Sequence, residues 1–211
     1  MNIHQNIEPN TTEDAFAAAY AAMRPALSGT DDKTLGGIRD EAMARFEALG
    51  LPHRRIEAWH YTDLRRLLGV ASASVGEVAA LSSVTTPFSG LKPARLVFSA
   101  GRIVAELSDL EGLGEGVDIG PLSAGPLPDW ALAEIAARRP AGDNAVFDLG
   151  LAMMSDGALI RVAAGQTPAR PIEIVSLSSG GGSFLRHVVV VEEGASLRLI
   201  EHSCGDGAMS L

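Results

Sequence analysis

The chain has 211 residues, of which 46% are hydrophobic and 20% are charged, an ordinary balance for a soluble globular protein. Its 26 acidic and 17 basic residues give a formal net charge of −9. This charge argues against broad contact with nucleic acid, because neutralising phosphates requires concentrated lysine and arginine. No run approaches the roughly 20 apolar residues of a membrane-spanning helix, and a single cysteine excludes a disulfide framework. No secretory signal is visible, so we expect a cytoplasmic protein without nucleic-acid or membrane partners.

The first part of the chain has the spacing of amphipathic helices. One helix is predicted to begin at Thr11 or Thr12 and to stop before Pro25, because the residue before a proline disfavours the α conformation. A second helix is predicted over residues 38–49, with Gly50 as its terminator.

Residues 51–68, LPHRRIEAWHYTDLRRLL, concentrate rare residue types. They hold one of the two tryptophans, one of the two tyrosines and two adjacent arginine pairs. If the segment is helical, Ile56 and Trp59 face inward together, and Thr62 caps a further short helix. The arginine pairs fit a solvated helix face, which is the usual explanation, or an acidic protein partner, because arginine and tryptophan are enriched at interface hot spots. Residues 70–90 are predicted to be an irregular connection.

From Ala94 onward the pattern becomes that of strands. A β-hairpin is predicted over 95–107, with Gly101 at the positive φ of a tight turn. Two helices follow, with Asp129 and Asp143 as the expected N-caps. Further strand-like runs start about 12 or 13 residues apart, near residues 158, 171, 184 and 196. Such spacing is typical of a sandwich, a barrel or a β-solenoid, and does not choose among them.

The chain stops at Leu211, soon after such a run, with no visible capping element. A solenoid needs its end rungs covered. We therefore expect a longer chain, or a partner that provides the cap.

The candidate chemistry is sparse. His202 and Cys204 lie two apart on a predicted strand and could supply half of a metal site, but structural sites use four ligands, so a surface histidine beside a half-buried thiol is the favoured interpretation. His187 is interpreted as a hydrogen-bonded strand residue. The glycine clusters near 112–116 and 180–182 lack the form of phosphate loops, and no nucleophile turn or carboxylate pair is evident. The sequence therefore predicts no catalytic, cofactor-binding or metal residue.

One motif points to a family. Residues 50–64 contain Gly-Leu-Pro, a basic pair and then Glu-x-Trp-x-Tyr-Thr-x-Leu. This motif resembles the SufB/SufD family of iron–sulfur cluster assembly proteins, and SufD more closely. Weaker similarities follow in order at 95–103, where Ala100 replaces the family's asparagine, and at 155–177 and 186–202. The resemblance covers most of residues 35–204, which corresponds to the N-terminal half of a family member. The motif residues, for which we predict a structural role, are Arg55, Glu57, Trp59, Tyr61 and Thr62.

The resemblance implies an α+β fold in three parts. These are an N-terminal helical domain (1–90), a mixed connecting region (91–157) and the first rungs of a right-handed parallel β-helix (158–211). It also implies a non-catalytic scaffold subunit of a SufB–SufC–SufD complex, with a SufB-like subunit and a SufC-like ATPase as partners, and it leaves room for a homodimer through the β-helix. The family's complex handles an iron–sulfur cluster, but no residue of this chain is assigned to it and no bound cofactor is expected.

Two alternatives belong to other classes. One is a carbohydrate-active β-helix enzyme, which the low aromatic content and the missing signal count against. The other is a protein-interaction module with no role in cluster assembly.

Overall fold

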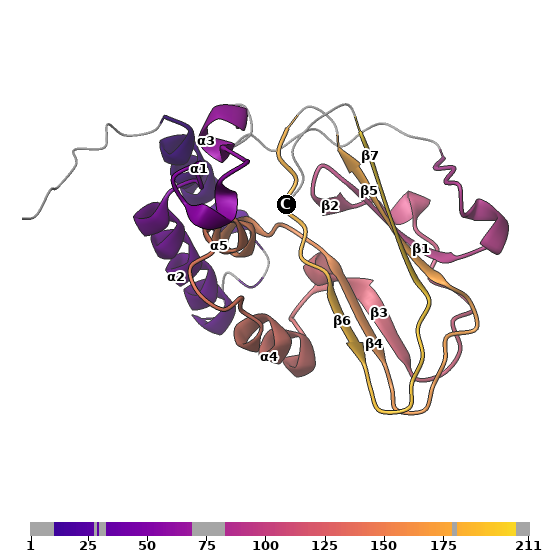
Figure 1. Ribbon diagram of the computed structural model, residues 1–211. Coiled ribbons are helices and arrows are strands. Elements are labelled where there is room, and N and C mark those ends of the chain that lie inside the picture. Colours follow the sequence, from indigo (N-terminus) through magenta and orange to yellow (C-terminus); the bar gives the residue numbers. More distant parts are fainter. Residues whose placement is uncertain (1–10, 28, 30–32, 69–82, 179–180, 206–211) are drawn as a thin grey trace, which may run out of the picture.

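A computed structural model describes the chain at residues 11–27, 29, 33–68, 83–178 and 181–205. Figure 1 shows the α-helices gathered on one side and two β-sheets on the other. The general α+β class expected from the sequence is therefore observed. Over these residues, no helix combines the length and the apolar character needed to cross a membrane.

The helical layer agrees with the apolar spacing of the sequence. Within the described residues its α-helices are α1 (Thr11–Met23), α2 (Lys33–Leu49), α3 (Leu64–Leu67), α4 (Asp129–Ala137) and α5 (Ala145–Met153). α1 begins where predicted and ends before Pro25. α2 begins five residues earlier than predicted. Gly36 and Gly37 lower its intrinsic propensity, but the full burial of Leu35 offsets that cost.

Three helix starts differ slightly from the prediction. The N-cap of α3 is Asp63 rather than Thr62, and Asp129 is the first helical residue of α4 rather than its cap. α5 is capped by Asn144, whose side-chain oxygen accepts a hydrogen bond of 3.0 Å from the N–H of Phe147. At α5, Asp143 and Asn144 are neighbours and equally good caps, so the local sequence does not choose between them.

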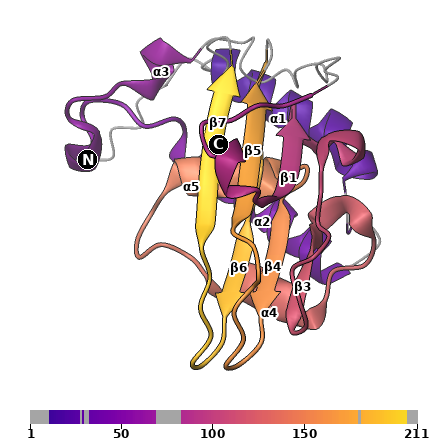
Figure 2. The ribbon, with the colours of Figure 1, turned by 90° about the vertical axis from the view of Figure 1, so that its right-hand side faces the viewer.

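The strands form two separate sheets. They are β1 (Ala94–Ser99), β2 (Arg102–Ile103), β3 (Val117–Pro121), β4 (Ala158–Val162), β5 (Ile172–Ser178), β6 (Val188–Val191) and β7 (Leu199–Gly205). One sheet has four strands in the order β2-β1-β5-β7, and the other has three in the order β3-β4-β6. Figure 2 shows β1, β5 and β7 side by side above β3, β4 and β6.

The expected right-handed parallel β-helix is wrong. From β4 to β7 the strands alternate between the two sheets, and β4 pairs in parallel with β6 while β5 pairs in parallel with β7. Each sheet also contains an antiparallel pair, β1–β2 in one and β3–β4 in the other. Among the described residues the sheets are therefore mixed and open, with neither a solenoid nor a closed sheet. The even spacing predicted how often strands recur, but not that β1, β2 and β3, which lie outside the repeat, would complete both sheets.

The predicted hairpin is confirmed at its turn, but its second strand is only Arg102–Ile103, and Ala105–Leu107 form a 3₁₀ turn instead of strand. β1 and β2 pair antiparallel around Ala100 and Gly101, whose φ angles are 49° and 74°. Positive φ at both central residues is the geometry of a type I′ turn, whose twist matches that of the paired strands. Glycine adopts this geometry without cost, whereas alanine is strained by about 1 kcal/mol.

Two apolar cores lie between the layers of the molecule, one beneath the helices and one between the two sheets. Residues alternate along β4, so Leu159 joins the helical core with Phe16 and Leu149, while Ile160 joins a second core between the two sheets. The helical core also takes Phe184 from the last third of the chain. It therefore contains residues from all three predicted parts, and the boundaries at 90 and 157 remain a prediction.

Candidate functional site

The segment that contains Trp59, residues 51–68, is closed at its base. Leu51 is buried, and its N–H donates a hydrogen bond to Oε1 of Glu13 in α1. The same carboxylate oxygen lies 3.3 Å from Nε of Arg65. The N–H of Leu64 donates to the carbonyl oxygen of Pro52 at 3.0 Å. The two ends therefore meet, and the residues between them form a compact Ω-type loop.

The closed part, residues 53–63, which we name the Trp59 loop, consists of turns. The N–H groups of Ile56, Trp59 and Thr62 each donate to the carbonyl three residues earlier, at 2.8–3.0 Å. A single 3₁₀ turn covers Glu57–Trp59. Ile56 and Trp59 were expected to face inward together only if the segment is helical; it is not, and Ile56 is 40% exposed while Trp59 is half-buried. The helical spacing on which this expectation rested does not apply to these turns.

The family-motif residues lie mainly at the surface. Arg55, Glu57 and Tyr61 are exposed, whereas Trp59 and Thr62 are half-buried. Figure 2 shows the segment extending away from the body of the molecule beside α3. The structural role of these residues remains a prediction, and the exposure of Tyr61 shows that its ring is not part of a core.

His202 and Cys204 both lie in β7, opposite Val175 and Leu177 of β5. Their spacing of two places them on one face of the strand. Cys204 is exposed. In the part of the chain that the structure describes, no group of three or more histidine, cysteine, aspartate or glutamate side chains could hold a metal ion.

His187 has a defined hydrogen-bonding role. Its Nδ1 accepts a hydrogen bond of 2.9 Å from the N–H of Ala158 at the start of β4, and its ring lies 5.5 Å from that of Phe98. Burial lowers the pKa of His187, while the charges of Glu201 and Asp156 oppose the shift. The neutral imidazole is therefore the form that holds β4 in place.

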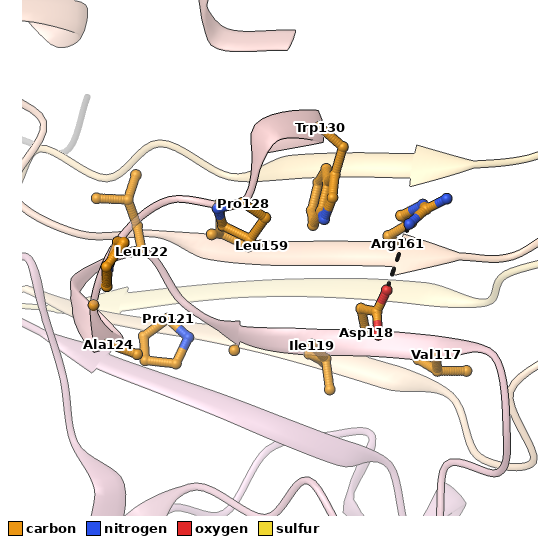
Figure 3. A pocket seen from close by; sticks show the side chains of 13 residues that line it. Val117, Asp118, Ile119, Pro121, Leu122, Ala124, Pro128, Trp130, Leu159 and Arg161 are labelled. Carbon is orange, nitrogen blue, oxygen red and sulfur yellow. Dashed lines mark ion pairs between the residues drawn. The ribbon is translucent and has the colours of Figure 1, made fainter. Parts of the chain in front are cut away.

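A groove of about 710 Å³ opens on one face of the three-stranded sheet (Figure 3). The register places Asp118 opposite Arg161 and Gly120 opposite Leu159, and Trp130 stands over them. Prolines complete its walls at Pro121, Pro126 and Pro128. We call this feature the Trp130 groove.

The charged side chains of the Trp130 groove are held in ion pairs. Arg161 lies 3.8 Å from Asp118 and 2.5 Å from the carboxylate of Glu192. The hydrogen bond from Arg161 lowers the pKa of Glu192. The groove can therefore enclose an apolar group, and its ionic side chains are already committed to one another.

Sequence reasoning missed Asp156, which borders a second cavity of about 570 Å³ between the end of α1 and β2. Its buried carboxylate accepts four hydrogen bonds of 2.8–3.0 Å, three from the N–H groups of Ile103, Ser123 and Gly157 and one from the Ser123 hydroxyl. The carboxylate is thus used to join β2, β4 and the loop after β3. The available signal was an acid between a serine and a glycine at the start of a strand.

Residues 10–74 match the family model described as the SufBD protein N-terminal region. This range includes α1, α2 and the whole Trp59 loop. The iron–sulfur cluster assembly protein SufD of Escherichia coli (strain K12) is 32% identical over 161 residues. The chain belongs to the SufB/SufD family. Within that family it is SufD-like.

A second relative extends the similarity. The iron–sulfur cluster assembly SufBD family protein of Synechocystis sp. (strain PCC 6803) is 28% identical over 192 residues, or 83% of this chain. The E. coli SufD match covers 72% of this chain. These alignments cover 40% of the cyanobacterial protein and 35% of E. coli SufD, so the chain spans less than half the length of either relative.

Proposed function

We propose that this chain is a non-catalytic scaffold subunit in iron–sulfur cluster assembly, working in a complex with a SufB-like subunit and a SufC-like ATPase. The observation that carries the proposal is the extent of the family similarity. Both relatives are named for iron–sulfur cluster assembly and align with 83% and 72% of this chain, far more than the motif alone.

Polar side chains that already make structural hydrogen bonds and ion pairs support a non-catalytic role. Asp156 uses its carboxylate for four structural hydrogen bonds, and Arg161 is held between two acids. Reactive groups in enzymes are instead placed to act on a substrate. In this proposal the iron–sulfur cluster is the cargo of the complex, and the chain works in the cytoplasm.

The direct test is co-purification from the source organism. The tagged full-length chain is purified under anaerobic, low-salt conditions, with an untagged strain as the control. We expect the SufB-like and SufC-like proteins to elute with it, and the chain alone to hydrolyse no ATP. Absence of both partners from the eluate would contradict the proposal.

A second measurement separates cluster assembly from a general interaction role. Activities of an iron–sulfur enzyme and of a cluster-free enzyme are compared in cells with and without the gene. We expect only the iron–sulfur enzyme to lose activity. Equal activities would favour an interaction module without a cluster role. The carbohydrate-enzyme alternative and the homodimer both relied on a β-helix, and no observation favours either.

A further inference from the structure

We propose that the Trp59 loop and the adjoining α3 form a docking surface for an acidic segment of a partner protein. This inference goes beyond a role in cluster assembly and does not depend on it. It rests on the exposure, the charge and the rigidity of the loop.

Large apolar side chains are concentrated and exposed on this surface. Among the described residues, the two most exposed large hydrophobic side chains are Tyr61, at 91%, and Leu67, at 70%. Ile56 lies in the same segment and is 40% exposed. Single exposed apolar residues are ordinary, but three within twelve positions, beside a half-buried tryptophan, are typical of an interaction site.

The charge of the surface is opposite to that of the whole chain. Arg54, Arg55 and Arg66 are exposed, and none of the ion pairs found in the described residues involves them. Glu57 is the exposed acid among them. The chain as a whole has a net charge of −9. The surface therefore favours a carboxylate-rich ligand, since a guanidinium can bind a carboxylate through two parallel hydrogen bonds.

The loop is ordered without a partner. Its successive turns are hydrogen-bonded at 2.8–3.0 Å, and its base is fixed by the hydrogen bond between Leu64 and Pro52 and by the contacts of Glu13. A surface that is already ordered loses little conformational entropy on binding. Tyrosine, tryptophan and arginine on such a surface are the residue types that dominate binding energies.

A protein fits these observations better than a polyphosphate or a bilayer. Nucleic acid would be repelled by the net charge of −9. Membrane-binding basic segments carry about four to eight clustered lysines or arginines. This surface has three exposed arginines with Glu57 between them, a pattern suited to a few specific carboxylates.

Photo-cross-linking in the source cells tests the proposal. A photoreactive phenylalanine analogue is placed at Tyr61 of the full-length chain, and in a second strain at Leu91, which is 57% exposed outside the loop. The protein cross-linked at position 61 is then purified and titrated with the wild-type chain. It is also titrated with the double variants R54E/R55E and R102E/R198E, which carry equal charge changes at exposed arginines.

We expect a cross-link at position 61 that is absent at position 91, and a partner with an acidic segment at the cross-linked site. R54E/R55E should weaken binding about tenfold or more and reduce its salt dependence, while R102E/R198E stays within about twofold. Circular dichroism checks that all variants are folded. The proposal is overturned by equal losses in both double variants, by no specific cross-link or by a cross-link only to a second copy of this chain. Loop-dependent binding to phosphatidylcholine–phosphatidylglycerol vesicles in place of the protein also overturns it.

Discussion

The guanidinium group of Arg39 in α2 donates a hydrogen bond of 2.6 Å from Nη1 to the carbonyl oxygen of Met154, just after α5. The same nitrogen donates to the carbonyl oxygen of Ala152 at 3.1 Å. The last carbonyls of a helix lack intrahelical donors and carry its negative dipole end, so a cation is favoured there. Burial lowers the pKa of Arg39 to about 10, which leaves it charged at neutral pH. Arg39 therefore fastens α2 to the end of α5.

Replacing Arg39 with methionine should destabilise the protein strongly. Arg39→Met keeps an apolar stem but removes the donor to two carbonyl groups at the C-terminal end of α5, at an expected cost of about 3 kcal/mol in the free energy of unfolding. Urea denaturation measures this difference. Arg102→Met, at an exposed site, is the control and should stay within about 0.5 kcal/mol. Similar losses in the two variants would show that the α2–α5 contact is not important for stability.

Because of His187, the free energy of unfolding should decrease in mildly acidic solution. Its folded-state pKa is lowered, so as pH falls below about 6.5 the unfolded chain takes up a proton before the folded one does. Stability is therefore expected to fall as the pH falls below about 6.5, because the protonated Nδ1 cannot accept from Ala158.

Two variants isolate the histidine. His187→Asn retains an acceptor near Nδ1 and should flatten the dependence of unfolding free energy on pH between about 5 and 7. His60→Asn, at an exposed histidine, is the matched control variant. Denaturation curves across this range decide the matter. A profile that is the same in wild type and His187→Asn would mean that another group controls it.

Replacing Gly101 with a larger residue should be unfavourable both because of its neighbours and because of its backbone conformation. Its φ is 74°, and an added Cβ would lie 2.6 Å from Oγ of Ser155, whose hydroxyl donates to the Gly101 carbonyl at 2.6 Å. Gly142 has a φ of 78° and open space around it. Gly142→Ala should therefore cost about 1 kcal/mol from backbone strain, and Gly101→Ala about 2–3 kcal/mol. Thermal or urea unfolding measures both, and equal costs would show that the hairpin relaxes around the methyl group.

Local signals in the sequence predicted local structure well. Pro25 limits α1, and the Ala100–Gly101 pair predicts the hairpin, because each acts through its own backbone conformation. The strand-like runs near residues 158 and 171 likewise predicted β4 and β5. These features need no knowledge of distant residues.

Features set by distant contacts could not be read in the same way. The spacing of the strands did not reveal that β2 and β3 pair antiparallel and make both sheets mixed, since these strands lie outside the repeat. Nothing next to Arg39 indicates a buried arginine, because its acceptors lie more than 100 residues later. The sequence left open whether the Trp59 loop is helical. Its turns are closed at a base that depends on Glu13 of α1.

Trp59 should contribute less to stability than a buried aromatic residue. Phe46 is fully buried and packs edge-on against Phe16 at 6.0 Å, so Phe46→Ala should cost about 3–5 kcal/mol. Trp59 is half-buried, and Trp59→Ala should cost about 1–2 kcal/mol because less apolar surface is lost from the interior. Tyr61→Ala, at a ring 91% exposed, should stay within about 0.5 kcal/mol.

Urea denaturation of the three variants ranks these side chains. The predicted order is Phe46 first, Trp59 second and Tyr61 last. A Trp59→Ala cost equal to that of Phe46→Ala would assign the indole to the core and give the motif a purely structural role. A small cost for Trp59→Ala and Tyr61→Ala, joined to loss of the partner cross-linked at position 61, would instead assign the motif to binding. Arginine and aromatic side chains on a preordered loop would then supply affinity rather than stability.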